Sequence, residues 1–246
     1  MVSYAQNAED VVLARALGDR TPGFYVDVGA ADPVRHSVTK HFYDLGWRGV
    51  NVEPVPSSFE ALRAARERDV NLGCAIGSEP GTLPLAVVDG TESLSTLDPG
   101  IAERHRADGW STAVVEVEVV PLDAVLEEHA ADRPIDFLKV DVEGREADVL
   151  ASVDLGRWRP SALVVESTEP NTTVASHAGW EPLVLAAGYE LALFDGLNRF
   201  YAHAGEPDVA ERLAVPANVF DRWVPYALWR WLDPEARARV AAETPG

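Results

Sequence analysis

Acidic residues flank a single glycine at the end of one apolar run, Phe24 to Val28. The run is rich in β-branched and aromatic residues, which is typical of a buried strand. Its end, at Asp27, Gly29 and Ala30, opens into a turn that reaches Asp32. In α/β proteins, ligands bind just outside the carboxyl ends of the strands. We therefore expect Asp27, Gly29 and Ala30 to line a pocket.

The chemistry of this turn favours a cationic ligand without phosphates. A dinucleotide site needs the pattern Gly-x-Gly-x-x-Gly, so that backbone amides can approach a pyrophosphate. Two carboxylates would instead repel a pyrophosphate and attract an amine and a sulfonium, both of which S-adenosylmethionine carries. Glu53 ends the second expected strand, 26 residues after Asp27, where it can accept hydrogen bonds from both ribose hydroxyls. We expect Ala75, near the end of the third strand, to lie against the adenine.

The elements that position these residues alternate between strand and helix. In the first third of the chain we expect strands at 23–28, 48–53 and 69–76, and helices at 6–17, 37–46 and 57–68, the first two capped by Asn7 and Ser37. This alternation predicts a mostly parallel sheet with helices on both faces. Residues 78–120 break the rhythm with two expected strands, 83–88 and 113–120, around a short helix near 99–106. We expect this segment to be an insertion or a lid over the site.

The second half of the chain resumes the alternation and ends in a hairpin. The expected strands lie at 135–142 and 162–166, and the expected helices at 121–129, 146–153 and 177–187. Asp195-Gly196 is a hairpin turn signal between strands at 189–194 and 198–203. A parallel sheet that ends in one antiparallel hairpin strand resembles the class I methyltransferase fold, a seven-stranded, Rossmann-like, three-layer α/β sandwich.

Composition excludes several classes of partner. The 246 residues carry a formal net charge of −19, which disfavours nucleic acid and anionic membranes, because both bind basic surfaces. No apolar run approaches the ~18 residues of a membrane span. The polar start of the sequence resembles neither a secretory signal nor a transit peptide. Cys74 is the only cysteine, so the chain cannot form a disulfide framework. We therefore expect one cytoplasmic domain over 1–246.

The last forty residues, 207–246, have a helical pattern and contain five aromatic side chains. An aromatic cluster of this kind is expected to pack on the body of the protein or on a second copy of it. The tail therefore makes a homodimer our expectation for the assembly.

Eight ordered motifs resemble those of the FkbM-type S-adenosylmethionine-dependent methyltransferases. They lie at residues 6–11, 25–30, 37–43, 46–54, 94–97, 137–144, 195–201 and 216–221. The resemblance implies an O-methyltransferase that acts on a hydroxyl of a sugar, glycan or natural product. It implies cofactor contacts at Asp27, Gly29, Ala30, Glu53 and Pro54, with Glu9 and Asp10 near the same site. It also places Asp141 and Glu143 where the methyl group is delivered.

An aliphatic hydroxyl is a poor nucleophile at neutral pH, so it needs a general base, a metal ion, or both. Glu143 is our first candidate for the base and His36 the second. Asp141 and Glu166 are the candidate ligands of a Mg²⁺ ion, although the sequence lacks the paired Glu-Asp that related sugar methyltransferases have after the fifth strand. Asn198 and Arg199, at the hairpin, are expected to contact the substrate.

Three other functions stay open at this point. The protein could be an N-methyltransferase, a non-catalytic binding subunit that keeps the fold, or a nicotinamide-dependent oxidoreductase. The missing glycine pattern disfavours the oxidoreductase. The intact pair of Asp27 and Glu53 disfavours the binding subunit.

Overall fold

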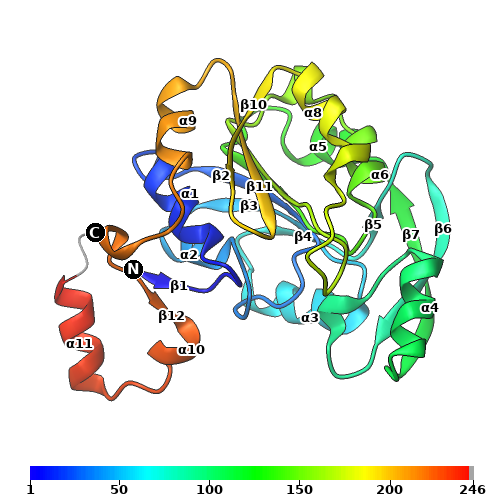
Figure 1. Cartoon of the computed structure of the whole chain (residues 1–246), viewed down its shortest axis with the longest axis horizontal. Helices are drawn as coiled ribbons and strands as arrows, with labels where there is room; N and C mark the ends of the chain where they lie inside the picture. The colour runs from blue at the N-terminus through cyan, green and yellow to red at the C-terminus, as the bar shows by residue number, and fades with distance from the viewer. Residues whose placement is uncertain (244–246) are drawn as a thin grey trace.

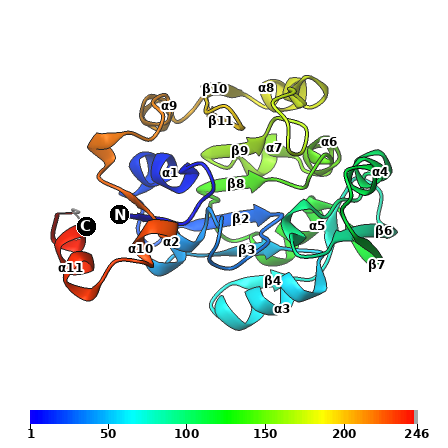
Figure 2. The same ribbon diagram turned by 60° about the horizontal axis from the view of Figure 1, so that its bottom comes forward.

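A computed structural model describes residues 1–243 of the chain. Figure 1 shows the whole chain. Its largest sheet has seven strands in the order β10-β11-β9-β8-β2-β3-β4, which can be followed from top to bottom in Figure 2. In chain order these strands are β2 (Phe24–Val28), β3 (Arg48–Val52), β4 (Val70–Leu72), β8 (Phe137–Val140), β9 (Ala162–Glu166), β10 (Tyr189–Phe194) and β11 (Asn198–His203).

Most neighbouring strands of this sheet run parallel. The pairs β2–β3, β2–β8, β3–β4 and β8–β9 are parallel, whereas β11 is antiparallel to both β9 and β10. The prediction of an α/β protein with a mostly parallel sheet is confirmed. The carboxyl ends of β2, β3 and β8 therefore meet at one edge of the sheet, where such proteins bind ligands.

Two apolar clusters cover the two faces of the sheet, because successive side chains of a strand point to opposite faces. Val26 and Val28 of β2 belong to one cluster, together with α5 (Leu122–His129), α6 (Glu146–Ala151), α7 (Leu155–Trp158) and α8 (Glu181–Ala186). Tyr25 belongs to the other cluster, together with α1 (Glu9–Leu17), α2 (Lys40–Asp44) and α9 (Pro207–Leu213). Figure 2 shows these helices on opposite sides of the strands.

The first two helices begin later than predicted, and the predicted caps do not cap them. Helix α1 starts at Glu9, behind Ala8 in a left-handed conformation (φ 61°), and Asn7 makes no capping hydrogen bond. Helix α2 starts at Lys40 instead of after Ser37. The buried Ser37 hydroxyl instead accepts a hydrogen bond from the Arg66 guanidinium at 2.9 Å. Helix α3 (Pro56–Ala65) follows β3 as expected.

The predicted strand at 69–76 is wrong as a single element. It divides into β4, at the edge of the main sheet, and β5 (Ala75–Ile76), which joins a separate three-stranded sheet of order β5-β7-β6. The other two strands of that sheet are β6 (Gly81–Val88) and β7 (Thr112–Val120), close to the predicted bounds. Between them lie the 3₁₀ turn η1 (Glu92–Leu94) and helix α4 (Pro99–Ala107), whose first turn is capped by the Asp98 carboxylate.

The tail contains several short elements and is only partly helical. After α9 come η3 (Val219–Asp221), β12 (Val224–Pro225), α10 (Tyr226–Trp229) and α11 (Pro234–Glu243). Strand β12 pairs with β1 (Val2–Ser3), and Tyr226 packs on Tyr4 with ring centroids 5.1 Å apart. Phe220 and Trp231 nevertheless remain 90 % and 78 % exposed. In the part of the chain that the structure describes, no helix is long and apolar enough to cross a bilayer.

Candidate active site

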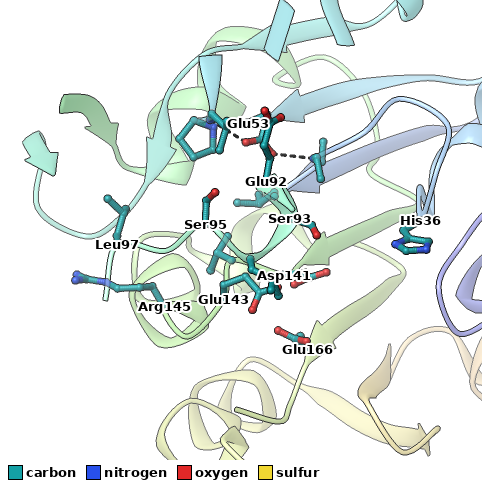
Figure 3. A pocket seen from close by; sticks show the side chains of 18 of the residues that line it. His36, Glu53, Glu92, Ser93, Ser95, Leu97, Asp141, Glu143, Arg145 and Glu166 are labelled. Atoms are coloured by element: carbon teal, nitrogen blue, oxygen red, sulfur yellow. Dashed lines mark hydrogen bonds between the residues drawn. The ribbon is translucent and has the colours of Figure 1, made fainter. Parts of the chain in front are cut away.

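A cavity of about 930 Å³ opens at the carboxyl ends of β2, β3 and β8. Nine of the predicted site residues line it: Gly29, Ala30, His36, Glu53, Pro54, Ala75, Asp141, Glu143 and Glu166. Figure 3 shows Asp141, Glu143 and Glu166 gathered together, with Glu53 apart from them on the same cavity. The structure thus brings five of the predicted cofactor residues and the predicted catalytic residues to one space.

The turn after β2 requires a glycine. Gly29 has φ 81°, a conformation that side chains rarely adopt, and a Cβ atom there would lie 1.7 Å from the carbonyl oxygen of Asp141. The amides of Gly29 and Ala30 both donate to the carbonyl of Val52, at 3.0 and 3.2 Å. Through these contacts the turn packs against the ends of β3 and β8, so that the ends of three strands form one wall of the cavity.

Glu53 is held on this wall by backbone hydrogen bonds. Its Oε2 accepts from the amide of Ala31 and its Oε1 from the amide of Val55, each at 2.8 Å. Burial raises the pKa of Glu53 to about 7, and the two backbone donors oppose that rise. The carboxylate is therefore fixed in orientation, while each oxygen keeps a second lone pair for a ligand.

Asp27 lies behind the cavity instead of lining it, so that part of our expectation is wrong. Its carboxylate is buried, accepts a hydrogen bond from Thr39 Oγ1 at 3.0 Å, and forms an ion pair with Lys139 at 3.3 Å. Lys139 does line the cavity. Asp27 and Asp141 raise the pKa of Lys139 above its ordinary value, although burial alone would lower it. Lys139 is thus a cation inside the wall.

Three carboxyl groups converge at the ends of β8 and β9. Asp141, Glu143 and Glu166 each place an oxygen within 4.8 Å of the other two. Burial, then the neighbouring charge of Asp141, raises the pKa of Glu143 to about 9 and that of Glu166 to about 11. Within the described residues, Oε2 of Glu143 and Oε2 of Glu166 are buried without a hydrogen-bond partner. The cluster can therefore take up a cation, whose charge would lower these pKa values and allow Glu143 to accept a proton.

The loop that presents Glu143 is held from two sides. Glu143 and Gly144 have φ values of 54° and 104°, which turn the chain sharply after β8. Glu146 accepts hydrogen bonds from the amides of Val142 and Gly144 at 3.2 and 3.1 Å. On the opposite side, Thr96 Oγ1 donates to the carbonyl of Glu143 at 2.8 Å. The segment at 78–120 therefore contacts the candidate base directly.

His36 lies at the rim of the cavity, in a left-handed conformation with φ 57°. Its backbone forms an isolated parallel bridge with Ala5, and Gln6 lines the cavity beside it. The residues before α1 thus add to the same wall.

The other predicted site residues contact parts of the protein outside the cavity. Glu9 accepts from the amide of Asn7 at 2.7 Å, and Asp10 accepts from Ser3 Oγ at 2.6 Å and from the amide of Tyr4 at 2.7 Å. Arg199 forms an ion pair with Glu181 at 2.9 Å. Like Asn198, these three residues are not among those that line the cavity. Their roles toward a ligand stay predictions.

Several cavity residues were missed by sequence reasoning. Lys139 lies inside a recognised motif, but its role depends on strand register, which places it opposite Asp27. Residues 171–174 follow β9 in a loop without a motif, and Trp110 and Arg145 also line the cavity. Composition alone gives these positions no signal that distinguishes them from surface loops.

Comparison with known sequences decides the family. Residues 27–191 match the methyltransferase FkbM domain. The chain belongs to this family. It is 34 % identical over 175 residues to methyltransferase sdnD of Sordaria araneosa, a match that covers 60 % of this chain and 67 % of that protein. It is 31 % identical over 158 residues to the AMB antimetabolite synthetase AmbE of Pseudomonas aeruginosa, covering 61 % of this chain and 7 % of that much longer protein. The matched FkbM region contains Gly29, Glu53, Asp141 and Glu166.

Proposed function

We propose that this FkbM methyltransferase transfers a methyl group from S-adenosylmethionine to a hydroxyl of a sugar, glycan or natural product. The observation that supports this proposal most directly is the shared cavity. One space contains a fixed carboxylate suited to a ribose, Glu53, and a cluster of carboxyl groups suited to manage a proton. Methyl transfer needs both functions within reach of one another.

S-adenosylmethionine fits the donor set of the cavity. In this proposal the free lone pairs of Glu53 accept hydrogen bonds from the ribose hydroxyls, and Gly29 and Ala30 face the methionine part. Pro54 and Ala75 provide apolar contact for the adenine. The acidic wall suits a ligand with an amine and a sulfonium, and the single Gly29 turn lacks the amide cradle of a pyrophosphate site. The bound cofactor supplies the activated methyl group.

We assign the general base to Glu143, with His36 as the second candidate. Oε2 of Glu143, buried and without a hydrogen-bond partner among the described residues, can accept a proton from an acceptor hydroxyl placed between the carboxyl cluster and the cofactor end. A positive charge beside Glu143 would lower its pKa, since burial and Asp141 are what raise it. Asp141 would orient the acceptor from the opposite side of the cluster.

Mg²⁺ also fits this cluster. Asp141 and Glu166, joined by Glu143, offer three carboxylate oxygens at the close spacing that a hard cation prefers. Such an ion would lower the pKa of a bound hydroxyl. Titration calorimetry with MgCl₂ should show binding to the wild-type protein and none to Glu166→Gln. Full turnover in excess chelator would remove the ion from the proposal.

The fold details belong to the same proposal. We take the sheet order, with β11 antiparallel between β9 and β10, as that of class I methyltransferases, and residues 78–120 as a lid on a single cytoplasmic domain.

N-methylation of an amine remains the alternative chemistry, since the same carboxyl cluster would bind an ammonium group. A non-catalytic binding subunit would have no use for the clustered carboxyls.

We further propose that the tail joins two copies of the chain. The last part of the tail, residues 222–246, contains four arginines and three acidic residues, so its formal net charge is +1 and that of residues 1–221 is −20. Exposed apolar side chains on this segment, Leu228 and Trp231, would be buried against the acidic body of a second copy. An anionic membrane would be repelled by that body.

The test of the function starts from the cofactor. S-adenosylmethionine and its demethylated product should raise the melting temperature and bind by calorimetry, whereas NAD should do neither. Glu53→Ala should abolish this binding, because the ribose loses its acceptor. Mass spectrometry of candidate glycans and metabolites with labelled cofactor would then identify the acceptor. Unchanged affinity in Glu53→Ala would refute the cofactor assignment.

A further inference from the structure

One ammonium group contacts two adjacent parts of the cavity wall, the turn after β2 and the carboxyl cluster after β8. Lys139 Nζ donates a hydrogen bond to the carbonyl of Gly29 at 2.6 Å and lies 3.3 Å from Asp27 and 3.4 Å from Asp141. Gly29 belongs to the turn after β2, and Asp141 follows β8. A single side chain, only 7 % exposed, thus fixes one residue of the proposed cofactor turn and one residue of the carboxyl cluster.

The register of the sheet explains why this side chain reaches all three groups. Lys139 pairs directly with Asp27 in the parallel ladder of β2 and β8, so both side chains lie on the same face. Asp27 is held from the other side by Thr39 Oγ1 and stays behind the wall. The acidic residue of the motif therefore faces Lys139, and Lys139 faces the cavity.

An ion pair between Lys139 and Asp27 that served stability alone would not require the two further contacts, to Gly29 and to Asp141. Lys139 and Asp27 would satisfy each other's charge without Gly29 or Asp141. The additional hydrogen bond to the Gly29 carbonyl is the shortest of the three contacts, and it lies on the turn that presents Gly29 and Ala30 to the cavity. The contact to Asp141 lies on the carboxyl cluster, directly beside that turn.

We propose that Lys139 is a positioning residue, which holds the cofactor turn at Gly29 in register with the reacting end of the cavity at Asp141. Asp27 acts through Lys139 by fixing its ammonium. This inference rests on the proposed methyltransferase function, because it assigns the Gly29 turn to the cofactor. It gives the acidic residue of the first strand an indirect role in place of a direct cofactor contact.

Two variants separate positioning from stability. Lys139→Met removes the ammonium but leaves Asp27 buried without its partner, which should lower the melting temperature. The double variant Asp27→Asn with Lys139→Met removes the buried charge as well, and it should recover much of the melting temperature. In both variants the Gly29 carbonyl and Asp141 lose their common partner. The matched control is Lys40→Met, since Lys40 is the only other lysine and pairs with Asp44 outside the cavity.

The readouts are cofactor affinity, steady-state kinetics and hydrogen exchange. The dissociation constant for S-adenosylhomocysteine should rise about tenfold or more in both variants, which is the range for loss of a charge-assisted hydrogen bond. The value of kcat should fall about 100-fold through misplacement of the reacting groups. In the cofactor-free protein, the amides of Gly29 and Ala30 should exchange faster in both variants. Lys40→Met should match the wild type in all three measurements.

The outcomes distinguish this inference from the proposed function. If the double variant regains wild-type affinity, kcat and exchange together with its melting temperature, Lys139 is structural and the inference is wrong. If the wild-type protein binds neither S-adenosylmethionine nor S-adenosylhomocysteine, the proposed function is wrong. In that case the exchange of Gly29 and Ala30 still tests whether Lys139 holds the turn.

Discussion

The side-chain amide of Asn198 donates a hydrogen bond to the carboxylate of Glu9 at 2.8 Å, between residues 189 positions apart in the sequence. Both groups are buried, and the contact ties the start of α1 to the start of β11. A residue expected to bind substrate and one expected near the cofactor are therefore partners of each other. The pair joins the N-terminal segment to the hairpin beside the cavity.

Asn198→Ala should lower the free energy of unfolding by about 1–3 kcal/mol, because it leaves a buried carboxyl oxygen without its donor. Urea denaturation measures the difference. Asn7→Ala is the matched control, since that exposed amide makes only a 3.4 Å contact with the carbonyl of Asp195. Equal stability of the two variants would show that the buried contact contributes nothing.

Stability should fall as the pH rises from about 4.5 to 7 through the titration of Glu9. Burial raises the pKa of Glu9 from 4.5 to about 7, so the folded state binds a proton that the unfolded state has released. This contribution is complete below the unfolded pKa and is lost as the pH passes the folded pKa. In Glu9→Gln the decline of the free energy of unfolding over this pH range should be smaller by up to about 3 kcal/mol. Urea midpoints at several pH values, with the exposed Glu128→Gln as control, measure it.

Glu143→Gln should reduce kcat by about 10²–10⁴-fold on an identified acceptor, because the amide cannot take the hydroxyl proton. Cofactor affinity should change little, since the proposed cofactor contacts lie at Glu53 and the Gly29 turn. The exposed Glu103→Gln, on α4, serves as the control. Near wild-type turnover would exclude Glu143 as the base and move the test to His36→Ala.

Gly29→Ala should be far more harmful than Gly46→Ala. Both glycines have positive φ, 81° and 91°, so both variants incur the left-handed strain of about 1–2 kcal/mol. Only at Gly29 would the new Cβ collide with a backbone atom, the carbonyl of Asp141, whereas Gly46 has open space. We expect Gly46→Ala to bind cofactor normally and Gly29→Ala to lose binding. Calorimetry and melting temperature together compare the two.

Leu228→Ser with Trp231→Ser should shift the protein from dimer to monomer in sedimentation experiments. The two side chains are 60 % and 78 % exposed on the tail, so the change should leave the melting temperature of the monomer nearly unchanged. Val114→Ser is the control, because Val114 is an exposed residue of β7 and lies outside the tail. A wild-type protein that sediments as a monomer at micromolar concentration would contradict the proposed dimer.

The parts of the fold that sequence predicted well are those with strong local signals. Strand β9 and the two hairpin strands β10 and β11 have the predicted bounds, because apolar runs end there at clear turn residues. The strand at 69–76 was wrong because its apolar pattern continues through Gly73 while the chain passes from one sheet to another. No local pattern records such a change of partner.

The residues of the candidate site also differ in how well the sequence predicts them. Gly29, Glu53, Asp141 and Glu143 follow directly after strands, so the topology alone brings them to the cavity. The contact between Glu9 and Asn198 and the contacts of Lys139 depend on tertiary register between distant segments. Residues 171–174 reach the cavity through a loop whose path is set by packing, which sequence periodicity does not describe.

The division of the third strand has a consequence for protein engineering. Ala75 and Ile76, which line the cavity at the expected adenine position, pair with β7 and thus belong to the small sheet of the 78–120 segment. Grafting that segment from another family member, in order to change the acceptor, would also replace the strand on which β5 is paired. A chimera of this kind should alter the KM for the cofactor together with the choice of acceptor, unless β5 is exchanged along with its partner.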